Sequence, residues 1–185
     1  MKRILTTAAA LSVLATAAFA DGHGKNPMVG GAEMFAEKNI VENAVNSADH
    51  TTLVAAVQAA GLVDTLQSDG PFTVFAPVND AFAALPAGTV ETLLMAENID
   101  QLTKILTCHV VAADVMSEAL VGLIEADGGV YDIATVGGCT LKASLNEGMV
   151  KIEDETGGIA TVTIADVKQS NGVIHVIDKV LLPAM

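Results

Sequence analysis

The spacing of apolar residues changes about halfway along the chain. In the first half they recur every three or four positions, as on one face of a helix. This spacing predicts helices over residues 53–60, 99–107 and 118–126, with shorter helices around Phe82 and Leu93. In the second half the apolar period becomes two, which is typical of strands. The predicted strands cover residues 131–136, 140–144, 149–153, 159–164 and 173–182.

One strand is also predicted within the helical half. Residues 72–76 form a short apolar run rich in aromatic and β-branched side chains, between a turn at Asp69-Gly70-Pro71 and the strand-ending Pro77. Such a run indicates a strand that is buried on both faces. A further short strand is predicted at residues 109–111. Because helices gather in one half and strands in the other, we expect a single α+β domain.

The first 20 residues have the three parts of a secretory signal peptide. Lys2 and Arg3 form a positive start, residues 4–18 are apolar or small, and Ala18-Phe19-Ala20 is a small-residue cleavage site. The apolar run is too short and too rich in alanine for a good membrane anchor, which needs about 20 strongly apolar residues. We therefore expect cleavage near Ala20, a periplasmic or secreted product and no membrane insertion.

The expected product divides into two parts. Residues 21–37 are rich in glycine and polar residues, and they predict a flexible N-terminal arm. Residues 38–185 then form the globular domain. No internal repeat or linker divides this domain.

The charge of the chain narrows the range of partners. It has 9 basic and 22 acidic residues, a net charge of −13, and loss of Lys2 and Arg3 leaves 7 basic residues and a net charge of −15. Such a surface repels nucleic acid and anionic lipid, so nucleic-acid binding is excluded. The carboxylates are scattered and form no calcium-binding loop motif, which favours a role in solubility.

Cys108 and Cys139 are the only cysteines of the chain. An even number of cysteines in an exported protein favours a disulfide. Two buried free thiols are the alternative. Two cysteines alone are too few for a zinc site, which needs four ligands.

Two segments, residues 70–82 and 170–183, stand out together. They resemble the two signature motifs of the fasciclin domain family, and residues 106–111 resemble that family's central tyrosine-histidine motif. The motif residues are Phe72, Thr73, Val74, Phe75, Ala76, Pro77, Asn79, Asp80, Phe82, His109, Gly172, His175, Val176, Asp178, Leu181 and Pro183. The resemblance implies a fold in which two β-sheets form a wedge with flanking α-helices. It also implies adhesion or binding, and not catalysis.

The chain departs from the family pattern at one position. Cys108 stands where the family usually has tyrosine, and in animal members that neighbourhood is tied to integrin-dependent adhesion. An integrin-type role is therefore not carried over. We hypothesise that Cys108 instead forms a bridge to Cys139 at the start of a neighbouring strand.

The motif residues have a mainly structural interpretation. Aromatic and branched residues of segment 72–76 fill the core, and Asn79 or Asp80 caps the helix that contains Phe82. Alternation along the last strand puts His175 on the face opposite to Ile174. A histidine in such a run is usually neutral and hydrogen-bonded, fastening one strand to another. A ligand-binding or pH-sensing role is the alternative.

No sequence pattern indicates an enzyme or a cofactor. His50, His109 and His175 lie outside any H-E-x-x-H motif, no G-x-S-x-G motif presents a serine, and the glycine pairs lie between strands. No metal site is expected in the folded part. If Asp21 becomes the first residue, Asp21-Gly22-His23 could bind copper(II) or nickel(II) through its amine, two amides and the imidazole. A flexible polar arm without metal is the alternative.

These observations predict a periplasmic or secreted module that mediates adhesion or binds an extracytoplasmic protein or polysaccharide. A periplasmic carrier of a small molecule or metal is the alternative. The oligomeric state is left open. We further expect segments 72–82 and 173–183 to lie side by side as walls of one hydrophobic interior.

Overall fold

The computed structural model describes residues 26–184, so the predicted signal peptide and the Asp21-Gly22-His23 site lie outside the described residues. The helices are α1 (Ile40–Ala44), α2 (Thr51–Ala59), α3 (Val63–Gln67), α4 (Asn79–Ala83), α5 (Thr89–Leu93), α6 (Ile99–Cys108) and α7 (Ser117–Ala126). The strands are β1 (Met28–Val29), β2 (Ala32–Glu33), β3 (Phe72–Pro77), β4 (Val110–Val111), β5 (Val130–Ala134), β6 (Thr140–Asn146), β7 (Met149–Glu153), β8 (Ile159–Gln169) and β9 (Gly172–Ile177).

Strands β3 to β9 form one continuous series in the order β4-β3-β9-β8-β7-β6-β5. β3 and β9 are parallel, and the other neighbours are antiparallel. The long strand β8 belongs to both halves of the series, because Ile159–Thr161 pairs with β7 and the part from Val162 onward pairs with β9. Irregular register near Ile164 lets the strand bend there. The result is the expected α+β wedge of two sheets with flanking helices.

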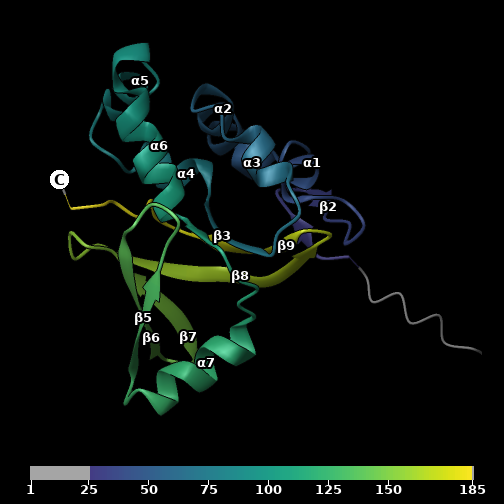
Figure 1. Cartoon of the computed structure of the whole chain (residues 1–185), viewed down its shortest axis with the longest axis vertical. Coiled ribbons are helices and arrows are strands. Elements are labelled where there is room, and N and C mark those ends of the chain that lie inside the picture. The colour runs from purple at the N-terminus through teal and green to yellow at the C-terminus, as the bar shows by residue number, and fades with distance from the viewer. Residues whose placement is uncertain (1–25, 185) are drawn as a thin grey trace, which may run out of the picture.

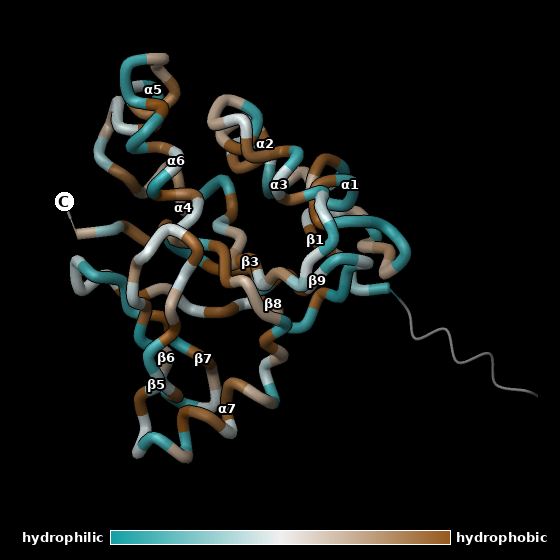
Figure 2. Tube along the Cα trace, viewed as in Figure 1, coloured by the Kyte–Doolittle hydropathy of each residue, from teal (hydrophilic) through white to brown (hydrophobic). Residues whose placement is uncertain are grey.

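Two hydrophobic cores lie on opposite faces of β3 and β9. One is built with α1, α2 and α6, and the other with α7 and strands β5 to β8. Figure 1 shows α1 to α6 gathered on one side of these strands and α7 on the other, and Figure 2 shows that β3 and β9 are largely hydrophobic. Ile174 belongs to the first core and Ile177 to the second, as the predicted alternation requires. Segments 72–82 and 173–183 therefore lie side by side.

The predicted flexible arm over residues 21–37 is wrong for residues 28–34. The short strands β1 and β2 form a hairpin around Gly30 and Gly31, and Val29 and Met34 are buried in the first core. The Gly30 carbonyl also accepts a hydrogen bond from Ala48 N–H (3.1 Å). Glycine here provides a tight turn with positive φ. Glycine in this segment therefore serves a hairpin turn and does not indicate a flexible arm.

The last strand is shorter than predicted, since β9 ends at Ile177 and not at residue 182. Beyond it, side chains bind the backbone N–H groups in place of a neighbouring strand. Leu181 N–H donates to His109 Nε2 (2.9 Å), and Leu182 N–H donates to Asp154 Oδ2 (2.9 Å). The segment is thus held in place without a strand ladder.

Helix α3 and the β1–β2 hairpin are not among the elements that the sequence pattern predicts. None of the helices within residues 26–184 has the length and apolar character needed to cross a membrane.

Candidate functional site

The motif residues of β3 pack in the interior of the protein. Val74 and Ala76 belong to the first core and Phe75 to the second, so both faces of the strand are covered. Thr73 is fully buried, and its hydroxyl donates to the Ala113 carbonyl (2.6 Å) and accepts from Val115 N–H (2.8 Å). Thr73 thereby holds the chain that follows β4.

His175 links β9 to two other segments. Its Nδ1 accepts a hydrogen bond from Asp166 N–H (3.3 Å), so its Nε2 carries the proton that is donated to the Val115 carbonyl (2.7 Å). Its ring stacks on Phe75, with 5.7 Å between ring centroids. Burial lowers the pKa of His175, which favours the neutral ring. These contacts occupy the imidazole completely.

His109 is the second buried motif histidine. Its Nδ1–H donates to the Ile105 carbonyl (2.8 Å), and its Nε2 accepts from Leu181 N–H (2.9 Å). Burial lowers the pKa of His109 to about 4, so the ring is neutral at pH 7. His109 therefore ties the end of α6 to the C-terminal segment.

His50 lies apart from the other two histidines, in the first core at the start of α2. Its Nδ1 is 2.9 Å from the Ser47 hydroxyl, and burial lowers its pKa. Within residues 26–184, no group of three or more histidine, cysteine or acidic side chains is arranged to hold a metal ion. The three histidines thus occupy three separate structural positions.

The prediction that Asn79 or Asp80 caps its own helix is wrong. Val78 is the N-cap of α4, without a side-chain hydrogen bond, and Asp80 is exposed in the first turn. Asn79 instead caps α2: its Oδ1 accepts from Thr52 N–H (3.0 Å), and its Nδ2 donates to the Ala48 carbonyl (2.8 Å). Phe82 is buried in the first core.

The second motif also serves the packing of strands. A Cβ at Gly172 would overlap the Phe72 carbonyl, so only glycine allows β9 to start this close to β3. Asp178 is exposed and accepts a hydrogen bond from Thr161 N–H (2.7 Å). Val176, Leu181 and Pro183 are buried.

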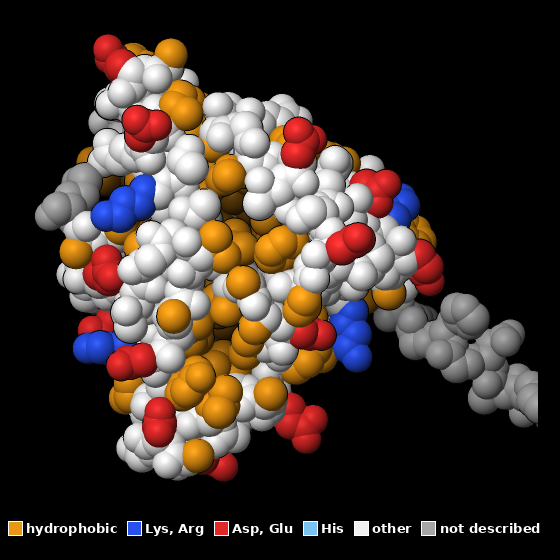
Figure 3. Space-filling view, in the orientation of Figure 1, with side chains coloured by type: hydrophobic (Ala, Val, Ile, Leu, Met, Phe, Trp, Pro, Cys, Tyr) orange, Lys and Arg blue, Asp and Glu red, His pale blue; other side chains and the backbone are white. Residues whose placement is uncertain are grey.

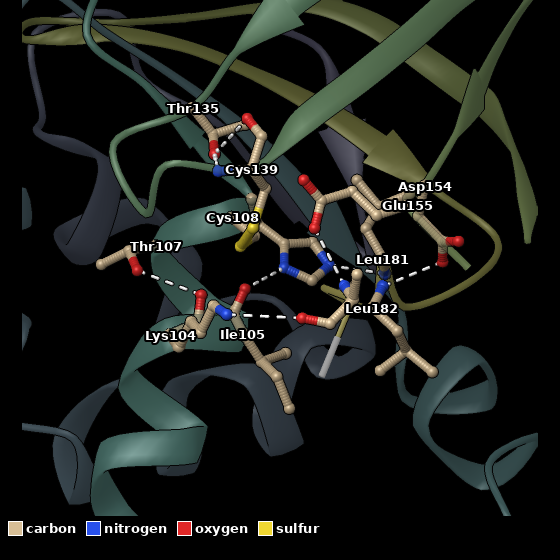
Figure 4. The surroundings of a disulfide bond; sticks show 12 residues. Lys104, Ile105, Thr107, Cys108, Thr135, Cys139, Asp154, Glu155, Leu181 and Leu182 are labelled. Atoms are coloured by element: carbon tan, nitrogen blue, oxygen red, sulfur yellow. Dashed lines mark hydrogen bonds between the residues drawn. A yellow bond between two sulfur atoms is a disulfide. The ribbon is translucent and has the colours of Figure 1, made fainter. Parts of the chain in front are cut away.

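A disulfide between Cys108 and Cys139 joins the end of α6 to the start of β6. Thr135 brackets Cys139 with two hydrogen bonds of 3.0 Å, and Leu181 and Leu182 lie close by (Figure 4). Val136 N–H, in the turn before Cys139, donates to the Val110 carbonyl (2.8 Å). We call the region around Cys108, Val136 and Cys139 the disulfide corner. Here the chain after β5 lies against β4.

An apolar groove begins at this corner. It lies between β5 and the chain at residues 111–115, which includes the end of β4. We call it the seam groove. It has a volume of about 330 Å³, and its lining includes Val111, Val115, Leu123, Tyr131, Ile133 and Val136. Leu123 is 39% exposed and Val136 is 49% exposed, while Val130 at the start of β5 is also 49% exposed. Figure 3 shows hydrophobic side chains gathered along the middle of this face, from α7 and β5 up to the space between α2 and α6.

The seam groove was not predicted from the sequence. Its walls come from three segments that are separate in the sequence: residues 111–115, α7, and β5 together with Val136. The one available signal was the presence of valine at positions 130 and 136, on the polar phase of the strand alternation.

Two other depressions have different properties. An apolar cavity of about 40 Å³ lies among α1, α2, α3 and α6, next to Leu106. An open depression of about 470 Å³ lies at the turns that precede β3 and β9, with Asp69, Asp114 and Lys168 at its sides. Of these three hollows, the seam groove is the one that is both mainly apolar and open.

Comparison with known proteins identifies the family. The fasciclin domain model matches residues 48–183. The chain belongs to the fasciclin domain family. Protein sll1483 of Synechocystis is 48% identical over 161 residues, which cover 87% of this chain and 82% of that protein. Transforming growth factor-beta-induced protein ig-h3 of Sus scrofa is 37% identical over 131 residues, covering 71% of this chain and 17% of that protein.

A solved structure of the same fold comes from an insect. The FAS1 domain pair of the insect cell adhesion molecule fasciclin I matches 78% of this chain and 51% of that chain, with a TM-score of 0.70 and 20% identity. At this identity the match establishes the fasciclin fold alone.

Proposed function

We propose that this fasciclin-domain protein is exported and binds a protein or polysaccharide partner in the periplasm or outside the cell. It acts as an adhesion or binding module and not as an enzyme. The seam groove carries this proposal. It is an apolar surface open to solvent, in a domain whose signature residues are mostly used for internal packing.

Exposed apolar residues cost little when they are scattered, but a continuous open groove marks an interaction surface. The motif histidines cannot serve as the recognition elements, because His109 and His175 each use both ring nitrogens within the fold. Recognition is therefore assigned to the exterior, and above all to the seam groove.

Two further observations support the proposal. The first 20 residues have the pattern of a secretory signal peptide, which requires an extracytoplasmic partner. A cell adhesion molecule, insect fasciclin I, is built on the same fold.

The volumes of the apolar cavity and the seam groove favour a carrier function less than an adhesion or binding function. Ligand pockets typically measure about 300–1,000 Å³ and enclose most of the ligand. The apolar cavity near Leu106 measures about 40 Å³, and the larger seam groove is more open to solvent. The metal-carrier variant of this proposal rests on Asp21 and His23, and the mass of the exported protein tests it, since any first residue other than Asp21 removes that site.

The proposal is tested by binding of the exported protein to washed cells and to isolated envelope fractions of the producing organism. Leu123→Ser places a polar side chain in the groove, while Ile159→Ser makes a similar change on β8, where Ile159 is 48% exposed. We expect at least about tenfold weaker binding for Leu123→Ser and unchanged binding for Ile159→Ser. Equal binding of both variants, or no binding of the unchanged protein, would refute the proposal.

A further inference from the structure

The backbone of β5 offers hydrogen-bonding groups at the open side of the sheet. Thr135 N–H donates to the Cys139 carbonyl (2.9 Å), in line with the β5–β6 register. In an antiparallel pair, residues that exchange hydrogen bonds recur at every second position. The groups that point away from β6 therefore belong to Val130, Asp132 and Ala134. β5 is the last strand of the series, and these outward groups have no hydrogen-bond partner within residues 26–184.

At the other end of the series, the outer edge of β4 is covered by the chain that follows β5. The same alternation turns the Val110 carbonyl of β4 outward, where it accepts the hydrogen bond from Val136 N–H. Gly137 N–H then donates to the Thr107 carbonyl (3.0 Å). The two terminal strands thus converge at the disulfide corner, and from there the seam groove lies between them.

A free strand edge and an apolar wall therefore face the same groove. The edge of β5 provides donors and acceptors at every second residue, and side chains such as Val115 and Leu123 provide apolar contact. We propose that the seam groove binds an extended segment of a partner polypeptide, which adds to β5 as a further strand. This inference rests on the proposed function and narrows the partner to a protein.

The chemistry of the groove favours a polypeptide over a glycan. An added strand satisfies unpaired main-chain groups and places alternate side chains into apolar contacts. The lining has one aromatic residue, Tyr131, and no charged side chain. A sugar chain would leave its hydroxyl groups against valine and leucine, where burial without hydrogen bonds is unfavourable.

Charge further specifies the partner segment. Exposed carboxylates adjoin lining residues of the groove in the sequence at Asp132 of β5 and at Asp114, which also lines the depression at the turns before β3 and β9. Lys142 lies opposite Asp132 in the register and partly offsets that charge. A second exported copy, with 7 basic residues, 22 acidic residues and so a net charge of −15, would be repelled. The segment is therefore apolar at alternate positions and flanked by basic residues.

The test uses the exported protein labelled with 15N and a defined probe, a synthetic peptide of alternating valine and threonine with two lysines at each end. Saturating peptide is expected to slow hydrogen exchange of the Asp132 and Ala134 amides at least about tenfold. The matched control is the same peptide N-methylated at every residue, so that neither edge of it has an N–H group to donate. It keeps the side chains but cannot form the strand ladder, so it should not bind.

Two variants separate the contributions of backbone and groove. Ala134→Pro removes an outward N–H without removing a bond to β6, and proline is tolerated at such an edge. Val136→Lys places a charge at the groove, and Ile159→Lys is the matched control, since the two residues are 49% and 48% exposed. We expect at least about tenfold weaker peptide binding for the first two variants and none of this loss for the control. Melting curves check that all three remain folded.

Several outcomes would overturn the inference. These are failure of the peptide to bind at millimolar concentration, equal binding of the N-methylated peptide, or protection of amides outside β5 only. A purified polysaccharide that protects the same β5 amides would also contradict it. If the peptide fails while Leu123→Ser still weakens binding to cells, strand addition is wrong and the proposed function stands. If cells are not bound either, both are wrong.

Discussion

The imidazole of His175 lies against the ring of Phe75, and the same two residues are opposite each other in the parallel register of β3 and β9. The two signature motifs of the family thus touch directly, on the face that contains the second core. From this position His175 also holds the Val115 carbonyl, next to the seam groove.

We predict that His175→Ala lowers the free energy of unfolding by about 2–4 kcal/mol, because it leaves a cavity and an unpaired buried carbonyl. Asp80→Ala is the matched control from the same family motifs. Asp80 is exposed, so its replacement should cost less than about 1 kcal/mol. Urea unfolding of both variants measures the difference. Similar losses would contradict the structural role of His175.

Buried neutral histidines predict a loss of stability in mild acid. Burial lowers the pKa of His109 from 6.5 to about 4, and it also lowers those of His50 and His175. As the pH falls below about 6.5, the unfolded chain binds protons that the folded chain does not, so the free energy of unfolding decreases until the folded pKa is reached. For His109 alone the decrease is about 3 kcal/mol between pH 6.5 and 4.

Urea unfolding at successive pH values measures this decrease, and His109→Gln should make its slope shallower. Histidine ring signals in NMR spectra give the direct check. If the His109 signals titrated near pH 6.5 in the folded protein, the assignment of a buried neutral ring would be wrong.

Much of the fold followed from periodicity alone. The apolar run at residues 72–76 became the buried strand β3, and the alternation around His175 placed its neighbours in the correct cores. Both patterns are local, because a strand side chain faces the side opposite to that of its neighbours. The disulfide between Cys108 and Cys139 agreed with the even number of cysteines.

What escaped prediction depends on contacts between distant segments. Asn79 caps a helix that begins 28 residues earlier, and no local pattern indicates this partner. The seam groove likewise is lined by segments that are far apart in the sequence and that meet near the hydrogen bond from Val136 N–H to the Val110 carbonyl. The hairpin around Gly30 was missed for a different reason, since two-residue strands are too short to show a period of two.

Removal of the disulfide should destabilise the protein substantially. The bridge closes a loop with a sequence separation of 31 residues. In the chain-entropy model this is worth about 3–4 kcal/mol. Thermal or urea unfolding of the Cys108→Ala/Cys139→Ala variant measures the loss. Titration of thiols in the denatured, unreduced protein checks the bridge itself, and two reactive thiols would show that it is absent from the isolated protein.

Two glycine substitutions should have opposite effects. Gly172→Ala places a methyl group onto the Phe72 carbonyl and should lower the free energy of unfolding by about 1–3 kcal/mol. Gly122 lies within α7, and a Cβ there meets no atom within 4 Å. Gly122→Ala should therefore raise the free energy of unfolding by about 0.5–1 kcal/mol. The two changes in midpoint of urea unfolding would need to differ in sign.

The bond from Val136 N–H to the Val110 carbonyl also limits how copies of this domain can stack on one another. Fibril growth by strand pairing needs two available edges in each molecule, one to accept a neighbour and one to pass the sheet on. In the seven-stranded series described within residues 26–184, the β4 end is covered and the β5 end is available. Edge-to-edge association through this series would stop at a pair. The domain can therefore keep one unpaired strand edge exposed without forming fibrils.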